Sequence, residues 1–470
     1  MLQPANDAFL QVLKEHLPEN VIGSVTDAYL EEPRGKWSGI GQILVRPETV
    51  EQVSDLLRLC NDHRVGVIPY AGGTGLVSGQ IMESGPVPVI LSLERMNKIR
   101  AVYPHENVLV ADAGAILAEI QAAAEAEDRL FPLSLASEGS ARIGGNLATN
   151  AGGVNVLRYG NTRDLCLGLE VVLPNGAIWN GLTRLRKDNT GYDLRNLMIG
   201  SEGTLGVITA AALKLAPRPR DVATALLCVP SPDAALGLLS LARSHVAEAV
   251  SAFELIGESG LVFLEEALPH IRQPFAQKPQ WMVLIELGVS RANAAAQAIE
   301  DVFQEALDRG LVYDGVIAQS AGQRNDLWAI RENIPQANRI IGSISSHDIS
   351  LPLSAISEFI AIAPTYIAKL GDFRINCFGH LGDGNLHYNV FPPKGESKSA
   401  YRHMINDVQN CVHDLVVSMQ GSFSAEHGVG RLKVADLERY GDPTKLAMMR
   451  AIKASFDPNG IMNPGAVLRV

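Results

Sequence analysis

Short blocks of apolar residues alternate with polar turns along residues 37–216, and these blocks predict a mixed α/β region. Apolar runs predict strands at 43–46, 66–69, 87–91 and 108–111. Apolar residues recur at helical spacing in 50–60 and 115–127, which predicts two helices. The region ends at a proline-rich stretch, 216–220, of the kind that separates domains.

A different order of elements begins near residue 221, where glycine becomes rarer. The predicted order is strand, helix, strand, helix, strand at 223–229, 232–245, 281–287, 291–309 and 314–318. This order is typical of an α+β domain with helices on one face of an antiparallel sheet. Residues 375–379 and 386–390 predict two more strands, folded back at the tight turn Gly382-Asp383-Gly384. The segment 433–455 predicts a helix.

Composition limits the function classes that fit this chain. Its 470 residues, 47% of them hydrophobic, are enough for two to three domains with cores of their own. Forty basic and 51 acidic residues give a net charge of −11 without a basic cluster, which argues against binding of nucleic acid or anionic membrane surfaces. The five cysteines are widely spaced and form no CxxC pair, so we expect thiols in a reducing compartment and no iron–sulfur ligation.

The first residues lack the basic and apolar blocks of a secretory signal. No apolar run approaches the roughly 20 residues that span a bilayer. We therefore expect a cytoplasmic protein that is not an integral membrane protein.

Two short segments near the C-terminus carry candidate metal ligands. His380-Leu-Gly-Asp-Gly-Asn-Leu-His387 places one imidazole on each side of a turn, and Ser424-Ala-Glu-His-Gly-Val-Gly430 adds Glu426 and His427. Because side chains alternate along a strand, Asn389 falls on the same face as His387. A His/His/Glu set with an open position binds a divalent catalytic metal; zinc is favoured, and manganese, iron or cobalt also fit. The alternative is a pair of hydrogen-bonded turn histidines with a loop Glu-His pair.

The glycine-rich segment 69–79 follows a predicted strand. It exposes backbone N–H groups around Gly72–Gly75, with hydroxyl groups at Thr74 and Ser78, which suits a diphosphate. No Gly-Lys-Ser/Thr follows, and Ser78 stands where a dinucleotide-binding fingerprint has its third glycine. The segment alone is therefore compatible with a plain turn.

Residues 132–153 contain I-G-G-N-x-A-T-N-A-G-G, and residues 192–208 contain G-S-E-G-T-L-G. With H-x-G-D-G-N-x-H and E-H-G-x-G, these motifs resemble the flavoproteins of the vanillyl-alcohol oxidase and p-cresol methylhydroxylase type, in particular the D-lactate, glycolate and D-2-hydroxyglutarate dehydrogenases. The resemblance extends from about residue 37 to Pro464. It implies an α+β protein with a two-subdomain FAD-binding domain and an α+β substrate (cap) domain built on an antiparallel sheet. The implied parts are a helical lead-in at 1–36, the FAD-binding domain at 37–216, the substrate domain at 217–420 and a segment returning to the FAD domain at 421–470.

The resemblance implies FAD as cofactor. The residues it assigns to the cofactor site are Pro69, Gly72, Gly73, Thr74, Gly75, Ser78, Pro132, Ser137, Gly139, Gly144, Gly145, Thr149, Gly153, Gly203, Val207 and Asn463. Some members of the family tether FAD through a histidine or cysteine in the glycine loops. Tyr70, Ala71 and Thr74 occupy those positions here, so we expect non-covalent FAD.

The resemblance also implies metal-dependent oxidation of a small D-2-hydroxy acid to the 2-oxo acid. His380, His387 and Glu426 would bind the metal and His427 would be the catalytic base. Arg331 would bind the 1-carboxylate of the substrate, with Asn389 and Ser346 as further substrate contacts. A solvated helix arginine is the alternative for Arg331.

Segments 182–194, 328–332 and 347–352 most resemble the D-2-hydroxyglutarate dehydrogenases. Ser346, however, stands where that family has a lysine, and Pro335 where it has a polar substrate contact. These departures argue against a second substrate carboxylate and leave D-2-hydroxyglutarate and D-lactate-like acids both open.

Three readings of the redox chemistry stay open. The favoured one is a dehydrogenase that passes electrons to a non-oxygen acceptor, such as an electron-transfer flavoprotein or a quinone-linked acceptor. The alternatives are a D-2-hydroxy acid or glycolate oxidase that forms hydrogen peroxide, and a flavoprotein subunit of a larger complex. A homodimer is compatible with each reading.

Overall fold

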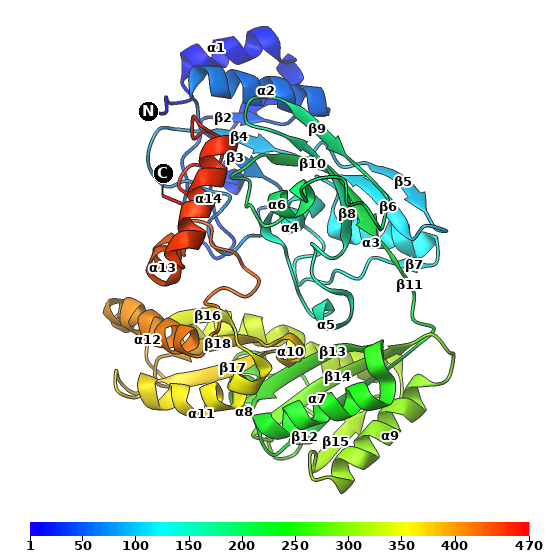
Figure 1. Cartoon of the computed structure of the whole chain (residues 1–470). Coiled ribbons are helices and arrows are strands. Elements are labelled where there is room, and N and C mark those ends of the chain that lie inside the picture. The colour runs from blue at the N-terminus through cyan, green and yellow to red at the C-terminus, as the bar shows by residue number, and fades with distance from the viewer. Residues whose placement is uncertain (470) are drawn as a thin grey trace. The chain divides into compact units, whose positions relative to one another are not determined.

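The computed structural model describes residues 1–469, and the chain forms two compact units (Figure 1). Unit 1 contains residues 1–152, 160–217 and the chain from Glu426 onward. Unit 2 contains Gly153–Tyr159 and Arg218–Ala425. Each unit therefore joins segments that are far apart in the sequence.

A small sheet in unit 1 has the strand order β1-β2-β4-β3. Its strands are β1 (Ile22–Ser24), β2 (Ile43–Val45), β4 (Val89–Ser92) and β3 (Val67–Tyr70). Strands β2 and β3 run parallel to β4, and α2 (Val50–His63) connects β2 to β3. The predicted helical lead-in is helical only at α1 (Asp7–His16) and in short 3-10 turns, because β1 pairs antiparallel with β2.

A second sheet in unit 1 is antiparallel throughout, in the order β5-β6-β10-β8-β9. Its strands are β5 (Ile99–Tyr103), β6 (Val108–Asp112), β10 (Val207–Lys214), β8 (Cys166–Val172) and β9 (Ile178–Gly181). The other elements of unit 1 before residue 426 are α3 (Leu117–Ala126), β7 (Arg129–Leu130), α4 (Ile143–Thr149), α6 (Leu194–Met198) and β11 (Ala216–Pro217).

The C-terminal segment contains two helices where the sequence predicted one. Helix α13 (Val434–Tyr440) ends before Gly441, and α14 (Pro443–Phe456) begins at a proline. Proline has no backbone N–H and fits the first turn of a helix better than its interior. The Asp442 side chain caps α14 by accepting the Lys445 N–H at 2.9 Å, so the break is built into the sequence.

Unit 2 is built on one antiparallel sheet of order β15-β12-β14-β13-β17-β18-β16. Its strands are β12 (Asp221–Val229), β13 (Val250–Gly257), β14 (Trp281–Val289), β15 (Asp314–Ile317), β16 (Ser345–Ser350), β17 (Arg374–His380) and β18 (Asn385–Phe391). Its helices are α5 (Val156–Tyr159), α7 (Pro232–Val246), α8 (Glu258–Ala267), α9 (Ala295–Asp308), α10 (Ala321–Ile341), α11 (Ile356–Ile367) and α12 (Ile405–Ser418).

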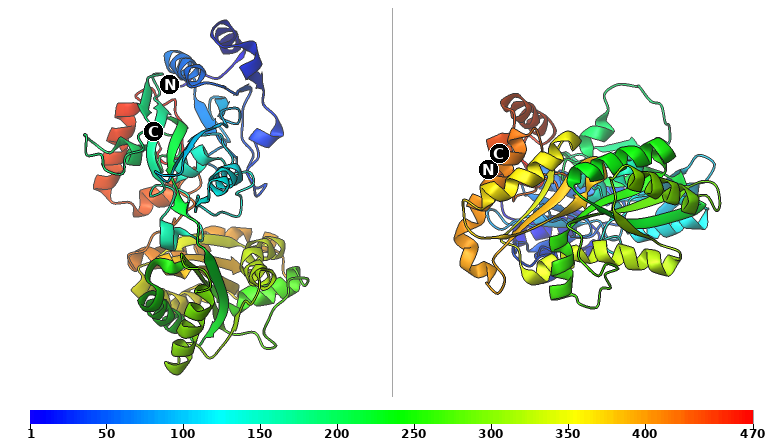
Figure 2. Two further views of the ribbon diagram at one scale, coloured as in Figure 1. Left: turned by 90° about the vertical axis from the view of Figure 1, so that its right-hand side faces the viewer. Right: turned by 90° about the horizontal axis from the view of Figure 1, so that it is seen from below.

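Helices cover both faces of this sheet, not one face as the sequence pattern suggested (Figure 2). One core contains residues of α7, α9, α11 and α12, and the other contains residues of α8 and α10. The cause is visible in β12, where Leu227 is buried in the first core and Leu226 in the second. When consecutive residues of a strand are apolar, both faces of the strand must be buried. Each face of this sheet is therefore covered by its own layer of helices.

The hairpin of β17 and β18 confirms the two strands and the turn predicted around the candidate metal ligands. A single 3-10 turn, Leu381–Asp383, and Gly384 connect the strands, and Phe378 lies opposite His387. Gly384 has φ +84°, and a Cβ atom there would lie 2.4 Å from the Leu351 carbonyl oxygen. Only glycine allows this approach without a shift of the backbone.

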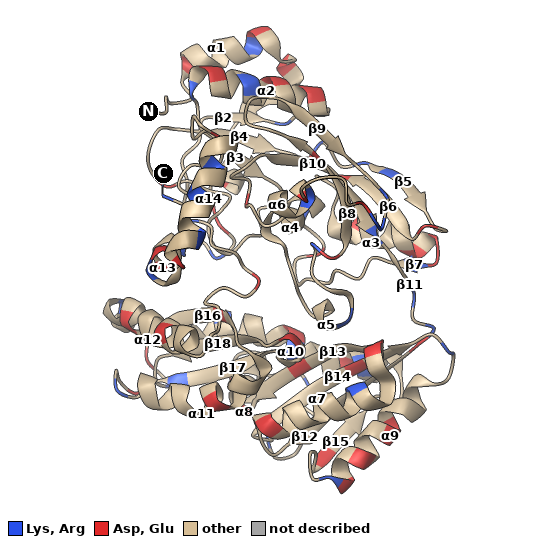
Figure 3. Ribbon diagram, viewed as in Figure 1, with Lys and Arg blue, Asp and Glu red and all other residues tan. Residues whose placement is uncertain are grey.

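Charged residues of both signs are dispersed over both units in Figure 3, and α14 carries Lys445, Arg450 and Lys453 without an acidic residue. Within residues 1–469, no helix combines the length and the apolar character needed to cross a bilayer.

We predict that Gly384→Ala destabilises unit 2 more than Gly310→Ala does. Both glycines have positive φ, but nothing lies within 4 Å of a Cβ atom at Gly310, so that variant carries only the left-handed backbone cost, about 1–2 kcal/mol. At Gly384 the clash with Leu351 adds to this cost. Urea midpoints of the two variants provide the measurement, and equal midpoints would contradict the steric argument.

Candidate active site

The loop after β3 has the free donors that a diphosphate site needs. Among the described residues, none of the backbone N–H groups from Ala71 to Gly79 donates a hydrogen bond. The Ser78 hydroxyl is buried and also has no partner. Buried polar groups are normally hydrogen-bonded, so this loop is suited to an anionic ligand. These observations fit the diphosphate of FAD.

Glycines bring the three glycine-rich segments of unit 1 together. A Cβ atom at Gly72 would lie 2.4 Å from the Ser140 carbonyl oxygen, and one at Gly203 would lie 2.9 Å from Pro69 Cγ. The backbones at Gly72 and Ser140, and the Gly203 backbone and the Pro69 ring, therefore approach more closely than a side chain at either glycine allows. The start of α4 is not a source of free donors, since the Gly144 N–H binds the Ala113 carbonyl at 2.7 Å.

The remaining predicted FAD residues belong to unit 1, with one exception. Pro132 follows β7, Ser137 accepts N–H groups from the turn that contains Gly139, Gly145 and Thr149 lie in α4, and Val207 begins β10. Gly153 has φ +103° and opens the short segment that clusters with unit 2. Their contacts with FAD stay predictions.

Glu202, in the middle of G-S-E-G-T-L-G, joins this region to the C-terminal segment. Its carboxylate accepts the backbone N–H groups of Val429 and Gly430, each at 2.7 Å. Burial raises the pKa of Glu202, while the two N–H groups act in the opposite direction. Sequence reasoning did not single out Glu202, although its place in a glycine motif is a signal.

Arg431 is the second residue that sequence reasoning missed. Its guanidinium donates to the carbonyls of Ser78 and Gly79 at 3.0 Å and to the Asn463 side chain at 2.8 Å. Burial lowers the pKa of Arg431 to about 10. The Asn463 amide in turn donates to the carbonyls of Gly79 and Glu202. The predicted FAD residue Asn463 therefore uses its side chain to hold the glycine loops together.

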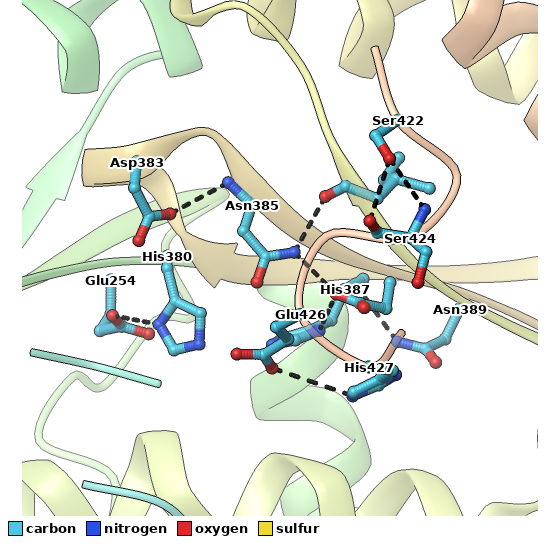
Figure 4. Close-up of polar contacts among 12 residues, drawn as sticks. Glu254, His380, Asp383, Asn385, His387, Asn389, Ser422, Ser424, Glu426 and His427 are labelled. Carbon is cyan, nitrogen blue, oxygen red and sulfur yellow. Dashed lines mark hydrogen bonds and ion pairs between the residues drawn. The ribbon is translucent and has the colours of Figure 1, made fainter. Parts of the chain in front are cut away.

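The predicted metal ligands His380, His387 and Glu426 lie close to one another, as Figure 4 shows. One potential ligand atom from each of His380, His387 and Glu426 lies within 4.8 Å of the others. The two imidazoles come from β17 and β18 and meet edge to face, with ring centroids 5.3 Å apart. Glu426 follows Ala425, whose N–H donates to the Asp348 carbonyl at 3.2 Å and so fixes the chain beside β16. This donor set suits a divalent metal.

A second group of potential ligand atoms, from Asp348, Glu426 and His427, also lies within 4.8 Å. Glu426 and His427 are neighbours in an irregular segment outside any helix or strand, so their side chains need not point to opposite sides as they would on a strand. His427 Nε2 lies 3.8 Å from a Glu426 oxygen. Asp348 was not predicted, and its carboxylate accepts an N–H from Asn385 at 2.9 Å.

Two predicted substrate contacts share a face of the sheet with this cluster. In the pairing of β16 with β18, Ser346 lies opposite Asn389 and Asp348 lies opposite His387. Residues directly opposite each other, and those two apart, point to the same side. The Asn389 amide donates to the His387 carbonyl at 3.2 Å. Ser346 is exposed, and its hydroxyl lies 2.7 Å from that of Ser343.

Arg331 is buried in α10, which excludes the solvated helix arginine considered above. Its Nε donates to Glu254 at 2.7 Å, and its guanidinium lies over the Phe378 ring, 4.8 Å from the centroid. Glu254 was not predicted; its other oxygen lies 2.7 Å from His380 Nδ1. Burial acts to raise the pKa of Glu254, but the charges at His380 and Arg331 outweigh it and lower the pKa to about 2.

Comparisons with known proteins identify the family. Residues 218–467 match the C-terminal domain of FAD linked oxidases, and residues 41–181 match an FAD binding domain. The mitochondrial D-2-hydroxyglutarate dehydrogenase of Rattus norvegicus is 38% identical over 91% of this chain and 78% of its own length. The putative D-lactate dehydrogenase of Schizosaccharomyces pombe is 35% identical over 93% of this chain and 84% of its own.

The chain belongs to the FAD-linked D-2-hydroxy acid dehydrogenase family. As a member, it is an FAD-dependent oxidoreductase that acts on the CH–OH group of D-2-hydroxy acids. The fold agrees with this family and with the predicted class. A solved structure of p-cresol methylhydroxylase superposes with a TM-score of 0.75 at 17% identity, covering 99% of this chain and 98% of the other.

We predict that acid or heat precipitates the protein and leaves FAD in solution. Tyr70, Ala71 and Thr74 offer no histidine or cysteine for a covalent bond to the flavin in the glycine loop. Absorbance of the supernatant and of the redissolved pellet measures the distribution of flavin. Flavin that stays with the pellet would contradict non-covalent binding.

Proposed function

We propose that this dehydrogenase oxidises a D-2-hydroxy acid with one carboxylate and depends on a divalent metal, with zinc as the favoured ion. The observation that supports this best is the proximity of the His380, His387 and Glu426 ligand atoms. His380 and His387 belong to the unit that also buries Arg331. FAD, when bound, accepts the hydride from the substrate α-carbon. A metal, when bound, lowers the pKa of the substrate hydroxyl group.

The three ligands fit a catalytic site better than a structural one. Structural zinc sites use four protein ligands, whereas catalytic sites use about three and leave a position for water or substrate. His380, His387 and Glu426 supply three ligands of the types that zinc accepts.

His427 is the proposed base for the hydroxyl proton. Its ring is partly exposed and lies beside Glu426, a proposed metal ligand. Histidine is the side chain best suited to exchange a proton near neutral pH.

Arg331 is the proposed partner of the substrate carboxylate. Its Nε donates to Glu254, and its guanidinium plane lies over the Phe378 ring. Its two terminal nitrogens have no partner among the described residues. These two nitrogens form the fork that recognises a carboxylate in a bidentate manner.

The proposed acceptor is not oxygen. The names of relatives support this choice: they are dehydrogenases and, in Saccharomyces cerevisiae, a D-2-hydroxyglutarate–pyruvate transhydrogenase that is 32% identical over 97% of this chain. An electron-transfer flavoprotein or a quinone-linked acceptor would take this role. Rapid hydrogen peroxide formation in step with turnover would contradict this choice.

The test of the function is anaerobic mixing with a panel of D-2-hydroxy acids and their L-isomers. We expect the D-isomers to bleach the flavin absorbance. His427→Asn should keep FAD and metal but slow this bleaching by roughly 10²–10⁴-fold, the usual contribution of general acid–base help. Bleaching at an unchanged rate would assign the base elsewhere, and absence of bleaching with every acid would contradict the proposed activity.

Removal of the metal should abolish flavin reduction while FAD stays bound, because the candidate ligands lie outside the glycine loops. We expect the same result for His387→Ala. Metal content and flavin absorbance are measured on the same sample, and readdition of zinc restores the chelated wild type but not the variant. Full activity in a metal-free sample would return these histidines to a structural role.

Ser346, in place of the lysine of the similar dehydrogenases, predicts that D-lactate competes well with D-2-hydroxyglutarate. A lysine can form a charge-assisted hydrogen bond with a second substrate carboxylate, whereas a serine offers only a neutral hydroxyl group. Ser346→Lys should shift kcat/KM towards the dicarboxylate, whereas Ser290→Lys, at an exposed position just beyond β14, should not.

A wild-type preference for D-2-hydroxyglutarate of a hundredfold or more would contradict this prediction. It would indicate that another cation replaces the lysine. Arg324 and Arg339 lie on the same helix as Arg331, about 10 and 12 Å along its axis, and would then be the first candidates.

A further inference from the structure

We propose that Glu254 is a positioning residue that orients a metal ligand and the substrate-binding arginine with its two carboxylate oxygens. The inference builds on the proposed function, since it assigns a partner to His380 and to Arg331. All the residues that carry it, Glu254, Arg331, Phe378 and His380, belong to unit 2.

The contacts of Glu254 are specific and fully buried. Glu254 lies in β13, directly opposite His380 of the neighbouring strand β17, and has no exposed surface. One oxygen lies 2.7 Å from His380 Nδ1, and the other accepts Arg331 Nε at 2.7 Å. Both oxygens of this carboxylate therefore have a charged or chargeable partner.

The contact with His380 determines which ring nitrogen faces the metal site. A carboxylate that accepts a proton from Nδ1–H keeps the proton on that nitrogen and leaves the lone pair on Nε2. Metal-binding histidines usually donate their second N–H to such an acceptor, which fixes ring orientation and raises ligand basicity. Glu254 is placed to do this for His380 (Figure 4).

The contact with Arg331 determines the direction of the guanidinium fork. Arginine in solution samples many rotamers, and ordering it on binding costs free energy. Here Glu254 holds Nε and the Phe378 ring packs against the guanidinium plane, so the fork is oriented before substrate arrives. One carboxylate thus preorganises the binding of both the metal and the substrate.

The variant Glu254→Gln tests whether Glu254 acts through its two hydrogen-bond-accepting oxygens or only by filling space. The amide has nearly the shape of the carboxylate, but its nitrogen cannot accept a hydrogen bond, so at most one of the two partners remains satisfied. The matched control is Glu286→Gln on the adjacent strand β14. Glu286 accepts hydrogen bonds from Thr224 and from Trp328 of α10, yet neither from His380 nor from Arg331.

The experiment uses FAD-loaded protein stripped of metal with a chelator. Zinc affinity is measured by competition with a chromophoric chelator. Pyruvate affinity is measured at saturating zinc from the change in the flavin spectrum. We expect Glu254→Gln to weaken zinc binding by about 10–100-fold, the usual effect of losing such an acceptor, and to weaken pyruvate binding at least tenfold. Glu286→Gln should stay within threefold of wild type in both.

Zinc and pyruvate affinities of Glu254→Gln within threefold of wild type would overturn the proposal. A purely structural role would lower the unfolding temperature and leave both affinities unchanged. If Glu254→Gln does not fold, Glu254→Asp replaces it: the charge remains, but a side chain one methylene shorter cannot reach both partners. That variant should lose at least one affinity tenfold, and retention of both would equally overturn the proposal.

The same data separate this inference from the proposed function. Wild-type protein that binds zinc and pyruvate but is not reduced by any D-2-hydroxy acid contradicts the function, and the affinities of the variant still test Glu254. Wild-type protein without zinc affinity contradicts the metal site and with it the role of Glu254 toward His380. The pyruvate titration then decides its role toward Arg331.

Discussion

The interactions of the buried Glu254 carboxylate with His380 and Arg331 link the sheet of unit 2 to α10. A fully buried charge is tolerated only when other charges and hydrogen bonds compensate for its lost hydration. Glu254 meets this condition through His380 on the next strand and Arg331 on α10. The position of α10 against the sheet, and with it the direction of Arg331, therefore follows from an electrostatic requirement as well as from apolar packing.

Unit 1 follows a different constraint, the close approach of backbone segments. Its glycine loops pack at distances that no side chain allows, as Gly72 against Ser140 illustrates. Among the described residues, this packing leaves the N–H groups of residues 71–79 without a hydrogen-bond acceptor. Arg431 binds the loop through the Ser78 carbonyl, and Glu202 accepts the Val429 N–H. A rigid loop with unused donors needs little reordering to bind a diphosphate. Cofactor binding in unit 1 thus depends on backbone N–H groups that form no hydrogen bond within the described part of the chain.

The sequence pattern predicted those strands and turns that are determined by residues close together in the chain. The apolar runs of β2, β4 and β12 and the hairpin with His380 and His387 lie where the sequence indicated, because short strands and tight turns are encoded within a few residues. The break at Pro443 was missed because helical periodicity continues across it. Glu254 was missed for another reason: it lies 126 residues before His380, and strand pairing over that distance leaves no local signal.

Charge balance links the metal and the substrate. Asp348, Glu254 and Glu426 are three carboxylates connected through the site, and Arg331 is the guanidinium among them. With both histidines neutral, as they are when they bind a metal, these side chains carry a net charge of −2, which one divalent cation offsets.

Every carboxylate of a bound substrate then adds negative charge that this set does not offset. The first carboxylate has the fork of Arg331, and a second would need a cation from outside these residues. Since Ser346 stands where a lysine would supply that cation, a second substrate carboxylate has no positive partner among these residues.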